Sequence, residues 1–325
     1  MYYLCYIMTM LKKITSSLHV AIIGDALGVP VESTPRNELS LCSVKNMLGY
    51  GRYDHPQGTW SDDSSMILCT MESLLKGTFD LEDLGKTFCQ WIFDGHWTPD
   101  GYVFDSGLTT FLALDRIRNA GISARNSGGK SEEDNGNGSL MRMLPAALYF
   151  HRLPTAEFLT AVHEVSAVTH AHPRALIGCG IYSLLIRELL ANDNKSEALR
   201  HAATDALGFY GNNPLFKPEL PNYMRILSLD IPQLFESDIN SSGYIVDTLE
   251  ASIWCFFRHE TSYDAILAAV NLGLDTDTTG AVAGGLAGLV HGIDDIPAEW
   301  INSLARQKEI EELIGRFASL VASPQ

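Results

Sequence analysis

The chain has 325 residues, of which 46% are hydrophobic, a composition typical of one large globular core and not of a disordered protein. Its formal net charge of −16 disfavours phosphate backbones, so neither DNA nor RNA is expected as a partner. The six cysteines form no CxxC pair, which argues against a disulfide framework or a zinc knuckle and suits the reducing cytoplasm.

The N-terminal run Met1–Leu11 is apolar but too short to span a bilayer. Lys12 and Lys13 follow this run, whereas a signal peptide places its positive charges before the apolar segment. We therefore expect residues 1–15 to be a short extension before the first helix, and residues 16–325 to form one domain. No membrane association is expected.

Helical periodicity of apolar residues dominates the chain, and strict strand-like alternation is hard to find. The clearest predicted helices are, in chain order, Met66–Leu75, Leu108–Ile117, Leu140–Phe150, Ala175–Leu190, Asp247–Phe257 and Ala265–Asn271. Glycine and proline clusters separate them, and no linker is long enough to divide two cores. The pattern predicts a single all-α domain.

The first helix is expected to end in the segment Gly24–Glu32, where a Gly/Pro break precedes Glu32. Taken on spacing alone, an isolated acid after such a break is usually a surface loop residue.

An unusual group follows, Ser61, Asp62 and Asp63, directly before an apolar helix. Serine and aspartate are preferred N-caps, so helix capping is one interpretation. One cap needs only one side chain, however, and adjacent carboxylates repel unless a cation lies among them.

The segment Ala124–Ser131 nearly matches a P-loop, but no buried strand precedes it and three acids follow, so ATP hydrolysis is not expected.

The glycine-rich segment 135–139 precedes a predicted helix, whose backbone amides could receive phosphate or ribose oxygens. A flexible helix cap is the alternative. His170 and His172 do not complete a zinc site, and a neutral pocket or packing role fits them better.

A second acidic group, Asp275, Asp277 and Thr278, also precedes a helix. Together the two groups supply about the number of oxygens that two magnesium ions take beside water and substrate. Neither contains histidine, which favours Mg²⁺ or Mn²⁺ over zinc. The small-residue segment 280–290 that follows is too short for a membrane dimer motif, so we expect it to pack closely in the core.

These motifs, in this order, resemble the ADP-ribosylglycohydrolase family, and within it the dinitrogenase reductase-activating glycohydrolases. The similarity runs from about Val20 to Trp300. It rests on Gly24-Asp-Ala-Leu-Gly with Glu32, Ser61-Asp-Asp, Asn137-Gly-Ser-Leu-Met-Arg, Thr169-His, Ser242-Gly-Tyr-Ile-Val-Asp-Thr, Asp275-x-Asp-Thr-Thr-Gly and Gly292-Ile-Asp-Asp-Ile-Pro.

The resemblance implies a compact orthogonal helical domain with a dinuclear Mg²⁺ or Mn²⁺ centre. The metal ligands it implies are Ser61, Asp62, Asp63, Asp275, Asp277 and Thr278, with Ser61 replacing the threonine usual in the family. It implies an ADP-ribose pocket lined by Asn137, Gly138, Ser139, His170 and Tyr244, and an acid at Asp134 that faces a substrate arginine.

The expected function is hydrolysis of ADP-ribose from modified protein, with N-linked arginine as the favoured linkage and ADP-ribose as the product. Either Asp63 or Glu32 is expected to transfer the proton. O-linked or nucleobase-linked ADP-ribose, or a non-catalytic ADP-ribose-binding protein, are the alternatives. A cytoplasmic monomer is expected.

Overall fold

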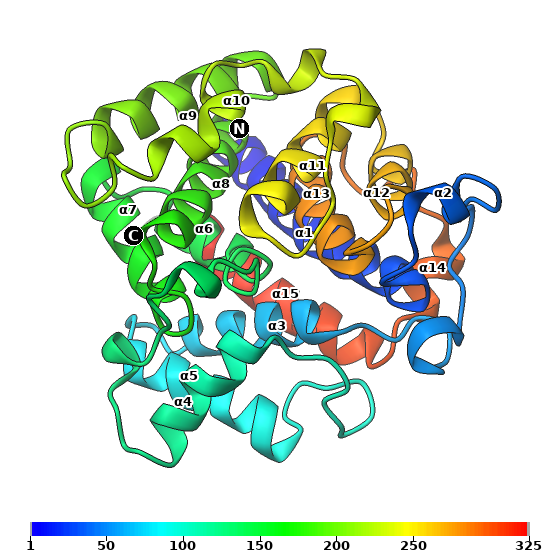
Figure 1. Ribbon diagram of the computed structural model, residues 1–325. Helices are drawn as coiled ribbons and strands as arrows, with labels where there is room; N and C mark the ends of the chain where they lie inside the picture. The colour runs from blue at the N-terminus through cyan, green and yellow to red at the C-terminus, as the bar shows by residue number, and fades with distance from the viewer. Residues whose placement is uncertain (1, 324–325) are drawn as a thin grey trace.

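The computed structural model describes residues 2–323, and in this part of the chain every regular element is a helix, which confirms the all-α prediction. Figure 1 shows the helices arranged around two that run side by side through the middle of the molecule, α1 and α13. Three isolated backbone bridges tie loops together in the described residues. One of them, Gly136 to Tyr244, connects the glycine-rich segment to the start of α11, and another joins Gly129 to His170.

The α-helices are α1 (Tyr2–Gly28), α2 (Arg36–Leu39), α3 (Asp62–Leu74), α4 (Leu81–Asp94), α5 (Leu108–Arg118), α6 (Leu144–Phe150), α7 (Thr155–Ala167), α8 (Pro173–Ala191), α9 (Lys195–Tyr210), α10 (Met224–Leu227), α11 (Ile245–Arg258), α12 (Ser262–Asn271), α13 (Thr276–Val290), α14 (Ala298–Ser303) and α15 (Gln307–Ala322). Short 3₁₀ turns lie between them: η1 (Val29–Val31), η2 (Gly51–Tyr53), η3 (Ala124–Asn126), η4 (Glu132–Asp134), η5 (Leu220–Tyr223), η6 (Ile231–Gln233) and η7 (Glu236–Asp238).

Small residues let α1 and α13 approach closely, as expected for the segment 280–290. A Cβ placed on Gly280 would lie 2.5 Å from the carbonyl oxygen of Gly24, and one on Gly284 would lie 2.5 Å from that of Val20. A Cβ on Gly288 would lie 2.6 Å from the Ser16 carbonyl oxygen, so the two helices run antiparallel. The C-terminal end of α1 therefore lies beside the N-terminal end of α13.

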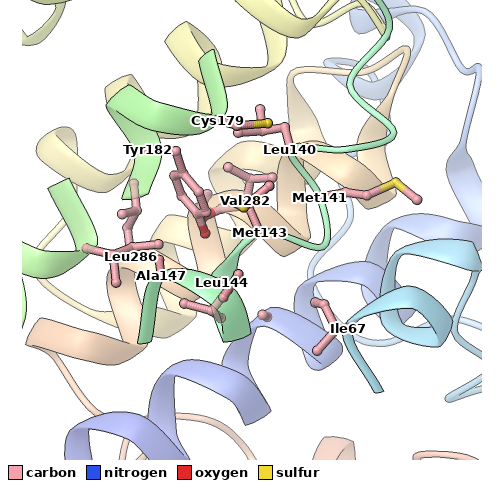
Figure 2. Packing of buried hydrophobic residues seen from close by; sticks show 14 of the residues in the cluster. Ile67, Leu140, Met141, Met143, Leu144, Ala147, Cys179, Tyr182, Val282 and Leu286 are labelled. Atoms are coloured by element: carbon pink, nitrogen blue, oxygen red, sulfur yellow. The ribbon is translucent and has the colours of Figure 1, made fainter. Parts of the chain in front are cut away.

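The remaining helices enclose this pair. Helices α3, α4 and α5 form one side, with α15 between α3 and α1. Helices α7, α8 and α9 form another side, and α11 and α12 cover α13 (Figure 1). Figure 2 shows the core between α3, α6, α8 and α13, made by Ile67, Leu140, Met141, Met143, Leu144, Ala147, Cys179, Tyr182, Val282 and Leu286. Leu140 and Met141 of this cluster directly follow the glycine-rich segment in the chain, and Asn137 of that segment is hydrogen-bonded to Asp275, the N-cap of α13.

Two predicted boundaries differ from the structure. The helix predicted to start at Leu140 begins at Leu144, because residues 137–142 form turns and Pro145 fits best in the first turn of a helix. The glycine-rich segment therefore does not itself open a helix. Residues 2–15 do not precede the first helix as predicted but form its first half. The domain boundary at residue 15 stays a prediction.

Helix α1 is long and apolar enough over Tyr6–Val31 to cross a membrane by length and composition, yet 83% of its most apolar stretch is buried in the fold. Buried residues such as Ile14, Leu18 and Ile22 pack into the common core. Burial of this kind is typical of the central helix of a helical domain. The cysteines whose pairing the structure describes are all free.

The close approach of α1 and α13 predicts a large difference between two glycine substitutions. Gly284→Ala places a methyl group against the Val20 backbone and should lower the free energy of unfolding by about 1–3 kcal/mol. Gly315→Ala, in α15 where no atom lies within 4 Å, should raise it by about 0.5–1 kcal/mol. Urea unfolding of both variants measures the difference, and equal effects would contradict the packing.

Candidate metal centre and substrate cleft

The first acidic group forms the N-terminus of α3. Ser61 is the N-cap and its hydroxyl accepts a hydrogen bond from the Asp63 backbone N–H at 3.3 Å, while Asp62 and Asp63 occupy the first turn. All three side chains are almost completely buried. The positive end of the helix dipole favours anions here, so the local sequence both starts the helix and concentrates carboxylates.

Asp25, in α1, caps the N-terminus of α3 through its carboxylate. Its carboxylate accepts hydrogen bonds from the backbone N–H of Ser61 at 3.0 and 3.1 Å, from the N–H of Ser64 at 2.9 Å and from the Ser64 hydroxyl. A side chain of another helix thus satisfies two N–H groups of α3. The side chains of Asp62 and Asp63 are left free for other partners.

The second acidic group, at the N-terminus of α13, meets the first. The Thr278 hydroxyl donates to the Asp63 carboxylate at 3.2 Å. Carboxylate oxygens of Asp25, Asp63 and Asp277 all lie within 4.8 Å of one another. The structure therefore brings together two clusters that are more than 200 residues apart in the sequence.

The charges in this cluster are poorly compensated by protein groups. Burial raises the pKa of Asp62, Asp63 and Asp277 well above the usual value, and the neighbouring carboxylates raise it further. Burial also raises the pKa of Asp25, to about 6. Asp63 Oδ1 is buried without a hydrogen-bond partner. An orphaned carboxylate oxygen among hard oxygen donors, with no cysteine or histidine in the group, fits a divalent cation of the Mg²⁺ type.

A further set of carboxylates lies at the cleft and shares Asp277 with the second acidic group. Oxygens of Glu32, Asp105 and Asp277 lie within 4.8 Å of one another. Glu32 follows η1 at the end of α1, so the break that ends the helix places it near the cluster. The Tyr53 hydroxyl lies in hydrogen-bond contact with Glu32 and at 3.0 Å from Asp105. Burial raises the pKa of both carboxyls.

Asp105, Asp25 and Tyr53 were not among the residues predicted from the sequence. Asp105 stands alone two residues before Gly107, the N-cap of α5, without a neighbouring acid. The signal that could have found it is its position shortly before a helix, which it shares with Asp62 and Asp275.

The cleft above the carboxylates has a volume of about 350 Å³. Its lining includes Glu32, Asp62, Asp105, Asp275, Asp277, Thr278, Gly136, Asn137, Gly138, Met141, His170 and the N-terminal residues of α5. Asn137 ties the glycine-rich segment to the acidic floor, because its side-chain amide donates to Asp275 at 2.7 Å and to Thr248 at 2.8 Å. The metal cluster and the ligand-facing loop are thus one hydrogen-bonded unit.

The residues predicted to bind substrate divide into two groups. Asn137, Gly138 and His170 line the cleft. Ser139 lies behind it, where its hydroxyl contacts Ser166 and Cys179, and the Tyr244 ring packs against the Arg174 guanidinium at 5.8 Å. Ser61 and Asp63 are buried beneath the cleft floor.

Asp134 does not face the cleft. Its carboxylate accepts from the Ser131 N–H at 2.9 Å, the Ser131 hydroxyl at 2.8 Å and the Thr109 hydroxyl at 3.1 Å. The bonds with Ser131 belong to the capping box of η4, and Thr109 of α5 holds the other carboxylate oxygen. Asp134 is not among the residues that line the cleft, and its role in arginine recognition stays a prediction.

The model of the ADP-ribosylglycohydrolase family matches residues 8–325. The chain is 30% identical to the ADP-ribosylarginine hydrolase Tri1 of Serratia proteamaculans, over 93% of this chain and 78% of that protein, and 32% identical to the Tri1 of Pseudomonas putida, over 90% and 74%. It is 31% identical to the ADP-ribosyl-[dinitrogen reductase] glycohydrolase of Rhodospirillum rubrum, over 89% of each. A solved structure, described as an ADP-ribosylglycohydrolase-related protein complex, superposes with a TM-score of 0.79 and 29% identity, covering 96% of this chain and 99% of that one.

The raised carboxyl pKa values predict how the metal-free protein responds to pH. A carboxyl with a higher pKa in the folded state binds its proton more tightly there, so its stabilising contribution is lost as pH rises from about 4 through the folded value, about 6 for Asp25. In EDTA at pH 7, Asp277→Asn removes one repelling charge and should raise the free energy of unfolding by roughly 1–3 kcal/mol.

The gain should shrink towards pH 4, where the wild-type carboxyls are protonated. Asp294→Asn, a change at an exposed acid paired with Lys12, should follow the wild-type curve. An Asp277→Asn variant less stable than wild type in EDTA at pH 7 would contradict the electrostatic account.

Proposed function

The chain belongs to the ADP-ribosylglycohydrolase family, and from that premise we propose that it removes ADP-ribose from proteins modified on arginine. The observation that carries the proposal is the meeting of two acidic helix N-termini at the floor of a cleft that the glycine-rich segment borders. The relatives named ADP-ribosylarginine hydrolase support arginine as the linkage, and the one named ADP-ribosyl-[dinitrogen reductase] glycohydrolase supports a protein as the target.

The cofactor we propose is a pair of Mg²⁺ or Mn²⁺ ions. Their ligands would be Ser61, Asp62, Asp63, Asp275, Asp277 and Thr278. When bound, such ions polarise substrate oxygens and make water a stronger nucleophile at neutral pH. The oxygen-only donor set and the orphaned Asp63 oxygen support this assignment.

The reaction we propose breaks the bond between C1″ of the ribose and the guanidinium nitrogen. A water oxygen bonds to C1″ as that bond breaks through an oxocarbenium-like transition state, and the departing arginine nitrogen receives the proton that Glu32 has taken from the water. Glu32 takes the proton of the water. Glu32 lines the cleft, and its pKa is raised. Asp63 is buried below the cleft floor, and one of its oxygens already accepts hydrogen bonds from the hydroxyls of Ser61 and Thr278.

Asp105 is the carboxylate we propose for the guanidinium group. It lines the cleft beside Glu32, and one of its oxygens lies 3.0 Å from the Tyr53 hydroxyl. A carboxylate can accept two parallel hydrogen bonds from a guanidinium, which gives both affinity and orientation. Asp134 is less suited, because both of its oxygens already accept hydrogen bonds, one from Ser131 and the other from Thr109 of α5.

The partner that follows is an ADP-ribosylated protein, and the product is free ADP-ribose. A cytoplasmic monomer remains our proposal for the working form. O-linked or nucleobase-linked ADP-ribose, and ADP-ribose binding without turnover, are the rival functions. The complete carboxylate set supports an enzyme over a binding protein.

Hydrolysis should be specific in linkage and dependent on metal. With Mg²⁺ or Mn²⁺, the protein should release ADP-ribose from ADP-ribosyl-arginine faster than from serine- or base-linked substrates, and EDTA should abolish turnover reversibly. Asp277→Asn should lower kcat/KM by about a thousandfold, since a bound metal contributes several kcal/mol to transition-state stabilisation. Liquid chromatography of released ADP-ribose measures each rate, with Asp294→Asn as the control. Full turnover in EDTA would refute the metal assignment.

The two acids considered for arginine recognition should behave differently. Asp105→Asn should reduce kcat/KM for ADP-ribosyl-arginine by about a hundredfold, because a charge-assisted bidentate contact is lost. Asp134→Asn should change it by less than about threefold, with the capping box weakened instead. Steady-state kinetics on both variants decides between them, and a larger loss at Asp134 would reverse the assignment.

A further inference from the structure

Arg142, just before α6, is completely buried and has no carboxylate partner among the described residues. Its guanidinium lies 4.4 Å from the centre of the Phe88 ring. It donates to the Gly138 carbonyl oxygen at 3.2 Å and to the Thr169 hydroxyl at 2.6 Å, while Nη1 has no partner. Burial lowers its pKa to about 9. Burying a cation without an anionic partner costs desolvation free energy, so a function of its contacts is expected.

The contact with Thr169 determines how that hydroxyl can be used. Arginine carries only donors, so the Thr169 oxygen must accept from Arg142. The same oxygen lies 2.8 Å from Nδ1 of His170, and these are its only hydrogen-bond partners in the described chain. If Nδ1 carried a proton, the buried Thr169 hydroxyl hydrogen would have no acceptor. The satisfied arrangement has Thr169 donate to Nδ1, which leaves the histidine proton on Nε2.

His170 presents that second nitrogen to the cleft. Its ring is buried in the cleft lining, and no described protein group is hydrogen-bonded to Nε2. Gly138 leaves room for the ring, since a Cβ there would lie 3.0 Å from its Cε1 atom. Burial and the nearby Arg142 charge lower the His170 pKa to about 3, although Asp134 acts in the opposite direction. The ring is therefore neutral at ordinary pH, so only one of its two nitrogens carries a proton.

We propose that Thr169 is a positioning residue, whose hydroxyl accepts from Arg142 and donates to Nδ1, and so holds His170 in its neutral Nε2–H tautomer. His170 then offers one fixed hydrogen-bond donor to an acceptor oxygen of the ligand in the cleft. The tautomer follows from the protein contacts alone, whereas the identity of the ligand as ADP-ribose rests on the proposed function. A donor fixed before binding costs the complex less ordering than a ring free to change tautomer.

Nitrogen-15 NMR of histidine-labelled protein reads the tautomer directly. Wild-type His170 should show the neutral Nε2–H pattern from pH 6 to 8. Thr169→Val removes the hydroxyl and should shift His170 towards a mixture of tautomers, while Thr169→Ser keeps the hydroxyl and should restore the wild-type pattern. Thr87→Val removes another buried hydroxyl, one that donates to the backbone carbonyl oxygen of Asp83, and should leave the His170 signals unchanged.

Titration calorimetry measures the affinity of each variant for ADP-ribose. Thr169→Val should weaken binding about tenfold and Thr169→Ser less than about twofold, as expected for one hydrogen bond. A wild-type Nδ1–H tautomer would overturn the proposal even if Thr169→Val fails to fold, and so would an unchanged tautomer in that variant. Absence of ADP-ribose binding by wild type would instead refute the proposed function, and the spectrum would still decide the tautomer.

Discussion

The structure depends on the meeting of two helix N-termini around a set of buried carboxylates. The first turns of α3 and α13 both direct their positive dipole ends at the space between Asp63 and Asp277. The dipoles and the hydroxyls of Ser61 and Thr278 offset part of the repulsion. They leave one Asp63 oxygen unpaired, so the protein concentrates more negative charge than it neutralises.

Helix α1 makes this arrangement possible. Its glycine-lined contact with α13 sets the position of one helix N-terminus, and Asp25 caps the other from the same helix. The break after Gly28 then returns the chain to place Glu32 at the cleft. One helix therefore positions both acidic groups and the acid proposed for proton transfer, which explains why its small and acidic residues occur together near its end.

Acids placed before helices were sufficient to predict the two main clusters, because a run of several carboxylates exceeds what capping requires. The same reasoning did not find Asp105, which stands alone, or Asp25, which lies inside a helix and becomes a cap only through tertiary packing. Asp134 looked equivalent to a cleft residue in sequence, but a local capping box turns its side chain away. The two clusters meet because α1 and α13 pack antiparallel. Local sequence patterns do not predict that tertiary contact.

Anomalous diffraction from crystals soaked in Mn²⁺ tests the central claim most directly. The account predicts manganese peaks between the N-termini of α3 and α13, within bonding distance of oxygens of Asp62, Asp63 and Asp277. A fully soaked crystal with no peak there, or with manganese only at other surface acids, would contradict it.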